Sequence, residues 1–120
     1  MYDLEKRTLR LAVEVREFIK LLPKTPANFE DAKQLIRSSG SIGANYIEAN
    51  GALGRKDFLM KIRISRKEAR ETIFWLNIII NANNLNPEVN TFCESLIAET
   101  SEIKYILSAI LKKSQEKSSY

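Results

Sequence analysis

The sequence contains no histidine and only one cysteine, Cys93. Without an imidazole the chain lacks the base of His-based catalytic triads, the ligand of His-bound zinc sites and the Glu-x-x-His motif of di-iron bundles. A single cysteine forms neither an intramolecular disulfide nor a cysteine-based metal cage, and this usage is typical of the reducing cytoplasm. Cys93 is best interpreted as a small packed hydrophobic residue. We therefore expect no metal and no cofactor.

Long apolar segments are also absent. No stretch approaches the roughly 18 to 20 uninterrupted apolar residues that span a membrane, and the N-terminal sequence MYDLEKRTLR has no apolar signal region. We expect a soluble, cytoplasmic protein without a membrane partner. With 120 residues, of which 44% are hydrophobic and 28% charged, the chain has the size and composition of one folded domain.

Apolar residues recur at spacings of three and four along four segments, and strand-like alternation is missing. The first segment, for example, places Leu4, Leu11 and Phe18 on one side. The periodicity predicts helices over residues 4–22, 27–50, 55–82 and 87–112, within a domain of residues 1–114 that a flexible polar tail, 115–120, follows. Short connections between long helices favour antiparallel neighbours. The predicted fold class is all-α, an antiparallel up-down four-helix bundle.

Several local signals support these ranges. Either Thr25, followed by Pro26, or Asn28 suits the cap that begins the second helix, and Gly51 suits a left-handed residue that ends it. Small residues, Ser39, Gly40 and Gly43, lie within that helix. They predict a close approach of a neighbouring helix, with a functional kink as the alternative. The inner stripe of the same helix extends to Tyr46 and Ile47.

The segment 55–82 is more apolar than one buried face requires, because its sequence IFWLNIII is hydrophobic on nearly all sides. We predict that this surplus surface is an oligomer interface with Phe74 and Trp75 as anchors. The alternative is a central helix covered by its own neighbours. The surplus stripe contains Ile79 in addition to the predicted interface residues, which are Met60, Ile64, Phe74, Trp75 and Ile78.

Polar residues on one face of the second segment, together with one from the third, form a predicted helix–helix cluster: Arg37, Ser41, Asn45, Glu48 and Glu71. An enzymatic interpretation would pair Glu48 with Glu71 for acid–base or metal chemistry. The sequence supplies no nucleophile and no further ligands for it. We favour ion pairs, Arg37 with Glu48 or Arg70 with Glu71, that fix the helix positions, and we predict no catalytic residue.

Positive charge is concentrated between residues 55 and 70, where seven Lys and Arg residues stand against two acidic residues in a chain of net charge +4. Five of these cations project within an arc of about 100° on a helix: Lys56, Arg63, Arg66, Lys67 and Arg70. One-sided basic stripes of this kind bind phosphate backbones. The alternative is a solvated face whose charges pair within the helix.

Two stretches, IRSSGSIGANYIEANG (36–51) and RKDFLMKIRISRKEARETIFWL (55–76), carry a family resemblance. The chain resembles the bacterial four-helix-bundle family whose first-named members are encoded within intervening sequences of 23S rRNA genes. It is also similar to the accessory variability proteins of diversity-generating retroelements. These resemblances imply a homopentamer, and for the second group binding to nucleic acid and to a reverse transcriptase. They attach no catalytic role to the matching residues.

The expected function is that of a non-enzymatic oligomeric scaffold that binds RNA or DNA through the basic stripe and holds a protein partner. The alternative is an oligomeric adaptor that binds protein only. An enzyme would need a ligand or metal near Glu48 and Glu71, and we do not expect one.

Overall fold

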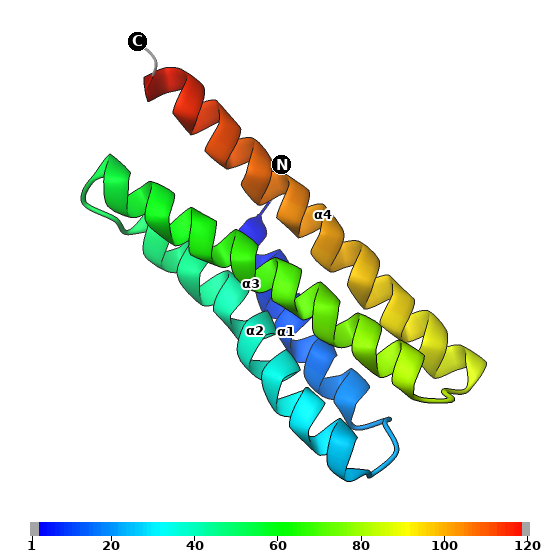
Figure 1. The fold of residues 1–120 in the computed structure, drawn as a ribbon. Helices are drawn as coiled ribbons and strands as arrows, with labels where there is room; N and C mark the ends of the chain where they lie inside the picture. Colours follow the sequence, from blue (N-terminus) through cyan, green and yellow to red (C-terminus); the bar gives the residue numbers. More distant parts are fainter. Residues whose placement is uncertain (1–2, 119–120) are drawn as a thin grey trace.

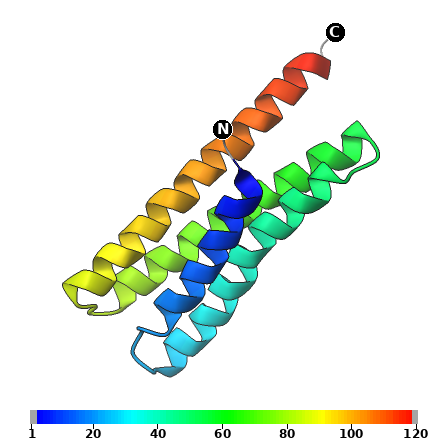
Figure 2. The ribbon, with the colours of Figure 1, turned by 180° about the vertical axis from the view of Figure 1, so that it is seen from behind.

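The computed structural model describes residues 3–118 and the side chains of residues 3–114. In this part the chain forms four α-helices: α1 (Leu4–Ile19), α2 (Pro26–Asn50), α3 (Arg55–Ala82) and α4 (Pro87–Ser118). Successive helices run antiparallel (Figures 1 and 2). Each packs against the next and α4 packs against α1, so α1 lies diagonally opposite α3, and α2 opposite α4. The predicted all-α four-helix bundle is confirmed.

Two of the helices begin at caps that the sequence signals. Thr25 accepts a hydrogen bond from the backbone N–H of Asn28 at 3.1 Å, and Pro26 occupies the first position of α2. Of the two predicted caps, Thr25 is therefore the one used. Asn86 plays the same part ahead of Pro87, because its Oδ1 accepts from the Val89 N–H at 3.0 Å. Both caps satisfy backbone donors that a helix start leaves unpaired.

Some helix ends differ from the prediction. α1 ends at Ile19 rather than at residue 22, because the chain tightens into bonds from Leu21 N–H to Phe18 O and from Leu22 N–H to Ile19 O. The expected left-handed geometry of Gly51 is wrong: its φ is −96°, and its N–H still bonds to Ile47 and Glu48 carbonyls. α4 continues to Ser118, six residues beyond the predicted end. The remainder of the predicted tail, residues 119–120, lies outside the described residues.

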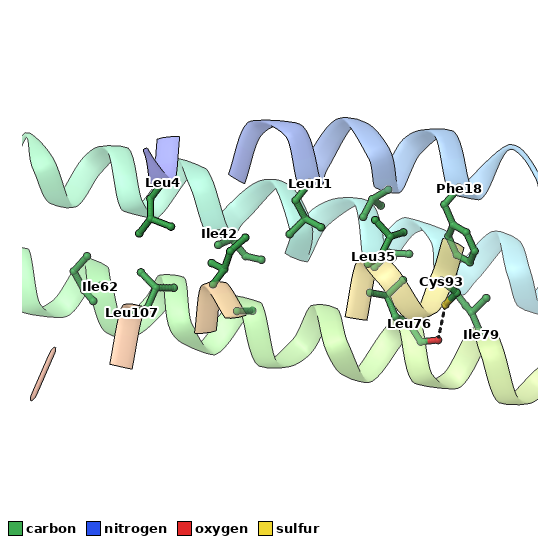
Figure 3. Packing of buried hydrophobic residues seen from close by; sticks show 14 of the residues in the cluster. Leu4, Leu11, Phe18, Leu35, Ile42, Ile62, Leu76, Ile79, Cys93 and Leu107 are labelled. Atoms are coloured by element: carbon green, nitrogen blue, oxygen red, sulfur yellow. Dashed lines mark hydrogen bonds between the residues drawn. The ribbon is translucent and has the colours of Figure 1, made fainter. Parts of the chain in front are cut away.

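One hydrophobic core runs along the bundle axis (Figure 3). Leu11, Phe18, Leu35 and Leu76 are almost completely buried, and each such side chain stabilises the fold by about 1.5–3 kcal/mol. Further core side chains labelled in Figure 3 are Leu4, Ile42, Ile62, Ile79, Cys93 and Leu107.

For two residues the predicted burial is wrong. Ile79, assigned to the surplus stripe, has 0% of its surface exposed, whereas Ile47, assigned to the inner stripe, has 52% exposed. In IFWLNIII every turn offers an isoleucine, so periodicity does not distinguish which one points inward.

Gly43 provides the close approach between α1 and α2. A Cβ at this position would lie 2.7 Å from Thr8 Oγ1 and 3.0 Å from Thr8 Cβ, so a side chain here would force the helices apart. The same prediction for Gly40 is wrong, because a Cβ there would meet no atom within 4 Å. Thus one glycine of the small-residue segment, not two, is required by helix packing.

The unequal helix lengths leave one end of the bundle without α1. α1 has 16 residues and α4 has 32. The start of α1 accordingly lies beside the middle of α4, and the last turns of α4 extend beyond it (Figures 1 and 2). The basic segment of α3 contacts this C-terminal half of α4, as described next.

Candidate nucleic-acid interface

The predicted basic residues form a stripe that begins on the flank of α3 facing α4 and continues onto the solvent side of the helix. Arg66 is half-buried on the flank facing α4, and its guanidinium donates a 3.4 Å hydrogen bond to the Ser108 hydroxyl of α4. Arg63, Lys67 and Arg70 are exposed and form no hydrogen bond or ion pair with any described residue. Lys56 is exposed on the same stripe, two turns before Arg63. The structure therefore places all five predicted cations along one side of α3.

Cations of α4 extend this surface, a feature that the sequence interpretation missed. Lys104, Ser108 and Lys112 are spaced four residues apart, which puts them on one face of α4. Because Ser108 contacts Arg66 and the helices are antiparallel, Arg70 lies at the level of Lys104. We call the resulting area the α3–α4 basic surface, and it comprises Arg63, Arg66, Lys67, Arg70, Lys104 and Lys112.

Glu68 and Glu71 of α3 point away from this surface toward α2. Arg37 of α2 donates to both carboxylate oxygens of Glu68 at 3.2 Å and to Glu71 at 2.7 Å. Glu68 is almost buried between the two helices. Its hydrogen bond with Arg37 raises the pKa of the guanidinium above the ordinary value, with Glu71 contributing in the same direction. These two carboxylates are thus unavailable to neutralise Lys67 or Arg70.

Acidic residues of α4 are turned away in a similar manner, toward α1. Arg7 of α1 lies 2.6 Å from Glu99 and 3.1 Å from Glu102. The acidic residues that form ion pairs thus face α2 in the case of α3, and α1 in the case of α4. Among the described residues, no carboxylate forms an ion pair with Arg63, Arg66, Lys67 or Arg70. Such segregation produces a surface potential that attracts anions.

The predicted polar cluster divides into two separate contacts. Arg37 and Glu71 are together as described, but the predicted pairs Arg37–Glu48 and Arg70–Glu71 do not form. Glu48 instead accepts from Lys61 at 2.8 Å, a bond that raises the pKa of Lys61. Lys61 and Glu71 are ten residues apart on α3, about 15 Å along the helix, so Glu48 and Glu71 do not form a carboxylate pair.

The remaining members of the predicted cluster contact each other within α2. The side-chain amide of Asn45 donates to the Ser41 carbonyl at 2.9 Å, one turn earlier. Their positions are therefore explained by the helix itself. Among the described residues, no three or more His, Cys, Asp and Glu side chains group closely enough to hold a metal ion.

The predicted oligomer residues differ in exposure. Met60 and Phe74 have 51% and 57% of their surface exposed. Ile64, Trp75 and Ile78 are half-buried, and Trp75 packs on the core and edge-on against Phe74 with ring centroids 5.3 Å apart. The Trp75 indole N–H is buried without a hydrogen-bond partner among the described residues. α3 thus exposes an apolar stripe on its outer side.

A second exposed apolar area lies on α1 and α2, and the sequence interpretation did not identify it. Leu9 and Val13 on α1 have 66% and 47% of their surface exposed, and Ile47 on α2 is exposed as well. Because Thr8 meets Gly43, Leu9 belongs to the same level of the bundle as the middle of α2. α1 is diagonal to α3, so the two apolar areas lie on different sides of the bundle.

Comparison with known families assigns the chain. The sequence model described as 23S rRNA-intervening sequence protein matches residues 2–109. The chain belongs to the 23S rRNA-intervening sequence protein family. The resemblance to this family found in the sequence is therefore confirmed. A comparison with curated proteins gives no match.

A solved structure shows the same fold for another member of this group. It is the crystal structure of a protein of unknown function, of the S23 ribosomal protein family, from Bacteroides thetaiotaomicron. The two chains are 35% identical with a TM-score of 0.80, and the match covers 92% of this chain and 99% of the other. This solved structure thus has the same four-helix arrangement as the chain described here.

The basic surface and the core differ in what chemistry they offer. Cys93 is buried against α3, with its thiol 3.6 Å from the Leu76 carbonyl (Figure 3), and burial raises its pKa to about 11. A protonated, enclosed thiol is a poor nucleophile.

No helix within residues 3–118 is long and apolar enough to cross a bilayer. The accessible chemistry is that of the cations on α3 and α4, which suits the binding of anionic groups.

Proposed function

We propose that this family member is a non-enzymatic oligomeric scaffold that binds RNA or DNA through the α3–α4 basic surface. One observation carries the proposal: the surface has six cations from two helices, while the nearby carboxylates are held by Arg37 on one side and Arg7 on the other. A solvated face with pairs inside the helix was the alternative for these charges. The absence of such pairs in the described residues favours a polyanionic ligand.

Charge reversal tests this function directly. The variant Arg63→Glu/Lys67→Glu/Arg70→Glu changes three exposed side chains that have no partner in the described part of the chain. The control Arg10→Glu/Lys20→Glu/Lys24→Glu changes the net charge equally on exposed positions outside the surface. Fluorescence anisotropy with labelled RNA and DNA measures the dissociation constants of both variants.

We expect wild-type binding to weaken steeply as salt is raised from about 50 to 200 mM, because each neutralised phosphate releases counterions. The surface variant should lose binding, and the control should retain most of it. Binding that is absent, independent of salt or equally weakened by both variants would contradict the proposal.

The assembly part of the proposal rests on the two apolar areas. A ring of identical chains joined head to tail requires two different complementary surfaces on each protomer. The stripe around Phe74 on α3 and the area around Leu9 on α1 and α2 supply two different apolar surfaces for such contacts, and the family resemblance implies five copies. A ring repeats the basic surface around its circumference and strengthens binding through multiple contacts.

Light scattering coupled to size exclusion tests the assembly. The wild-type protein should have the mass of a pentamer, and Phe74→Glu should shift it to smaller species because a charge would be buried at the contact. Lys33→Glu, another exposed position, serves as the control. A wild-type mass equal to one chain at all concentrations would refute the oligomer.

The second candidate is an oligomeric adaptor that binds protein only. The exposure of Leu9, Val13 and Ile47 on the neighbouring helices α1 and α2 favours it, since these apolar side chains are left without a place in the core and offer a protein partner surface to bury. It predicts capture of a specific protein after nuclease treatment, with the basic surface variant as effective as the wild type.

A further inference from the structure

Tyr105 is a large aromatic side chain on the exposed side of α4. It has 68% of its surface exposed, more than Phe29, Phe74 or any buried ring of the core. The Lys104 Nζ lies 4.9 Å from its ring centroid, and this cation is the interaction that the ring makes among the described residues. The other clear ring contacts, Phe18–Phe92 and Phe74–Trp75, involve aromatic partners. Most of the Tyr105 ring is therefore accessible to a ligand.

The surroundings of Tyr105 belong to the α3–α4 basic surface. On a helix, the residues three, four and seven positions away share a face, and for Tyr105 these include Ser108 and Lys112. Ser108 is bonded to Arg66 of α3, so the ring borders the row of cations formed by both helices. Glu102, the acid closest to Tyr105 along the chain, is 3.1 Å from Arg7 on α1. Glu102 is three positions before Tyr105 and lies near the same face, but its carboxylate is paired with Arg7. The accessible π-face of Tyr105 thus stands beside Ser108 and Lys112.

Single-stranded nucleic acids are bound by this combination of groups. Cations follow the phosphate backbone, and an exposed aromatic ring stacks on a base. In a duplex the faces of the bases are covered by their neighbours, so a ring on the outside of a straight helix has no base face to stack on. An exposed ring beside the basic surface therefore favours single strands over base-paired duplexes.

We propose that the ligand of the α3–α4 basic surface is single-stranded nucleic acid and that Tyr105 is the platform on which one of its bases stacks. The inference rests on the proposed function and adds the substrate class and a residue outside the predicted cations. Because every base has a π-face, the platform selects for unpaired bases and tolerates any sequence.

The experiment compares three replacements of Tyr105 with the wild-type protein. Tyr105→Phe keeps the ring, Tyr105→Leu keeps apolar bulk without a π-face, and Tyr105→Ala removes both. Phe29→Ala is the matched control, because Phe29 is 60% exposed on α2. Each protein is titrated with a labelled uridine RNA, a thymidine DNA of equal length and a mixed-sequence duplex, and light scattering checks that its oligomeric state is unchanged.

We expect the wild type to prefer the single strands to the duplex. Tyr105→Ala and Tyr105→Leu should bind single strands roughly 5- to 100-fold more weakly, while Tyr105→Phe and Phe29→Ala should retain the wild-type affinity. Salt dependence should persist in all of them, because the cations remain. The RNA and DNA arms decide which strand is preferred.

The failures of the two proposals are distinguishable. If the wild type binds single strands in a salt-dependent manner and Tyr105→Ala binds equally well, the stacking platform is refuted and the basic surface stands. A wild type that prefers the duplex refutes the single-strand assignment in the same way. If Tyr105→Leu matches the wild type while Tyr105→Ala does not, apolar contact rather than stacking explains the residue. No binding by the wild type refutes both proposals.

Discussion

The two flanks of α3 differ in how their polar groups are used. On the flank toward α2, Arg37 bonds to Glu68 and Glu71, and the Ser65 hydroxyl donates to the Ile42 carbonyl at 2.7 Å. On the flank toward α4, the polar contacts between the helices are longer: 3.4 Å from Arg66 to Ser108 and 3.6 Å from the buried Cys93 thiol to the Leu76 carbonyl. Both flanks cover the same hydrophobic core. One is closed by short, matched polar contacts, and the other leaves its cations to the solvent.

This difference separates residues that hold the fold from residues that are free to bind. A charge that already has a partner between two helices contributes to stability and is a weak site for a ligand. An exposed cation without a partner contributes little to stability, so replacing it changes binding rather than folding. Paired substitutions on the two flanks should reveal this division.

The largest difference is expected between two arginines. Arg37→Ala should lower the free energy of unfolding by about 2 kcal/mol, because Glu68 would remain between α2 and α3 without its cation. Arg63→Ala on the open flank should change it by less than about 0.5 kcal/mol. Urea denaturation at fixed protein concentration measures both values.

A second substitution identifies the cause of the Arg37 effect. Adding Glu68→Gln to Arg37→Ala removes the stranded carboxylate and should restore part of the lost stability. Equal losses for Arg37→Ala and Arg63→Ala would show that the closed flank is not held by its charges.

A smaller difference is expected between two serines. Ser65→Ala removes a buried 2.7 Å bond to the Ile42 carbonyl and should cost about 1 kcal/mol. Ser108→Ala removes the long, half-exposed bond to Arg66 and should cost less than about 0.5 kcal/mol. Both are measured by the same denaturation. A Ser108→Ala protein that is the less stable of the two would reverse the assignment of the flanks.

A pH-dependent effect is expected at Cys93, which lies between α4 and α3. Burial raises the pKa of the Cys93 thiol from 9.0 to about 11. Between these values the unfolded chain loses the thiol proton while the folded chain keeps it, so this group's contribution is complete below pH 9 and is lost as the pH rises toward 11.

Cys93→Ala provides the control for other groups that titrate in this range. The stability difference between the wild type and the variant should shrink as the pH is raised. Curves that stay parallel would show that the thiol does not titrate differently in the two states. A thiol reagent should react with Cys93 only when urea unfolds the chain.

The helices and most of the core follow from local sequence patterns. Leu11, Phe18 and Leu35 fall on periodic stripes, and proline and Asx or threonine caps mark where α2 and α4 begin. Patterns were insufficient where the sequence offers several equivalent choices, as in IFWLNIII, where Ile79 rather than Ile78 is fully buried. They also misplaced the end of α1, because Leu22 remains buried although the helix has already ended.

The candidate site was predictable only in part, because it depends on contacts between helices. The cations of α3 form a stripe in one helix, so their common side was visible in the sequence. The partners of Arg37 depend on how α2 lies against α3, which periodicity does not determine. Arg70 and Glu71, as adjacent residues, point in directions about 100° apart and face different helices. Lys104 and Tyr105 become part of the surface only because Ser108 meets Arg66.

The missing side chain of Gly43 has an effect at the opposite side of the molecule. Thr8 fits against α2 because Gly43 has no Cβ. If α1 slid by one turn, either Leu4 or Ala12 would take the place of Thr8 against Gly43. The Leu4 side chain is larger than that of Thr8, and the Ala12 side chain is smaller and would leave a gap. The fit of Thr8 against Gly43 therefore favours the present axial position of α1, and with it the level at which Arg7 meets Glu99 and Glu102. The absence of a side chain at Gly43 on α2 thus helps to position Arg7, which neutralises Glu99 and Glu102 and so affects the electric field that α4 presents to a ligand.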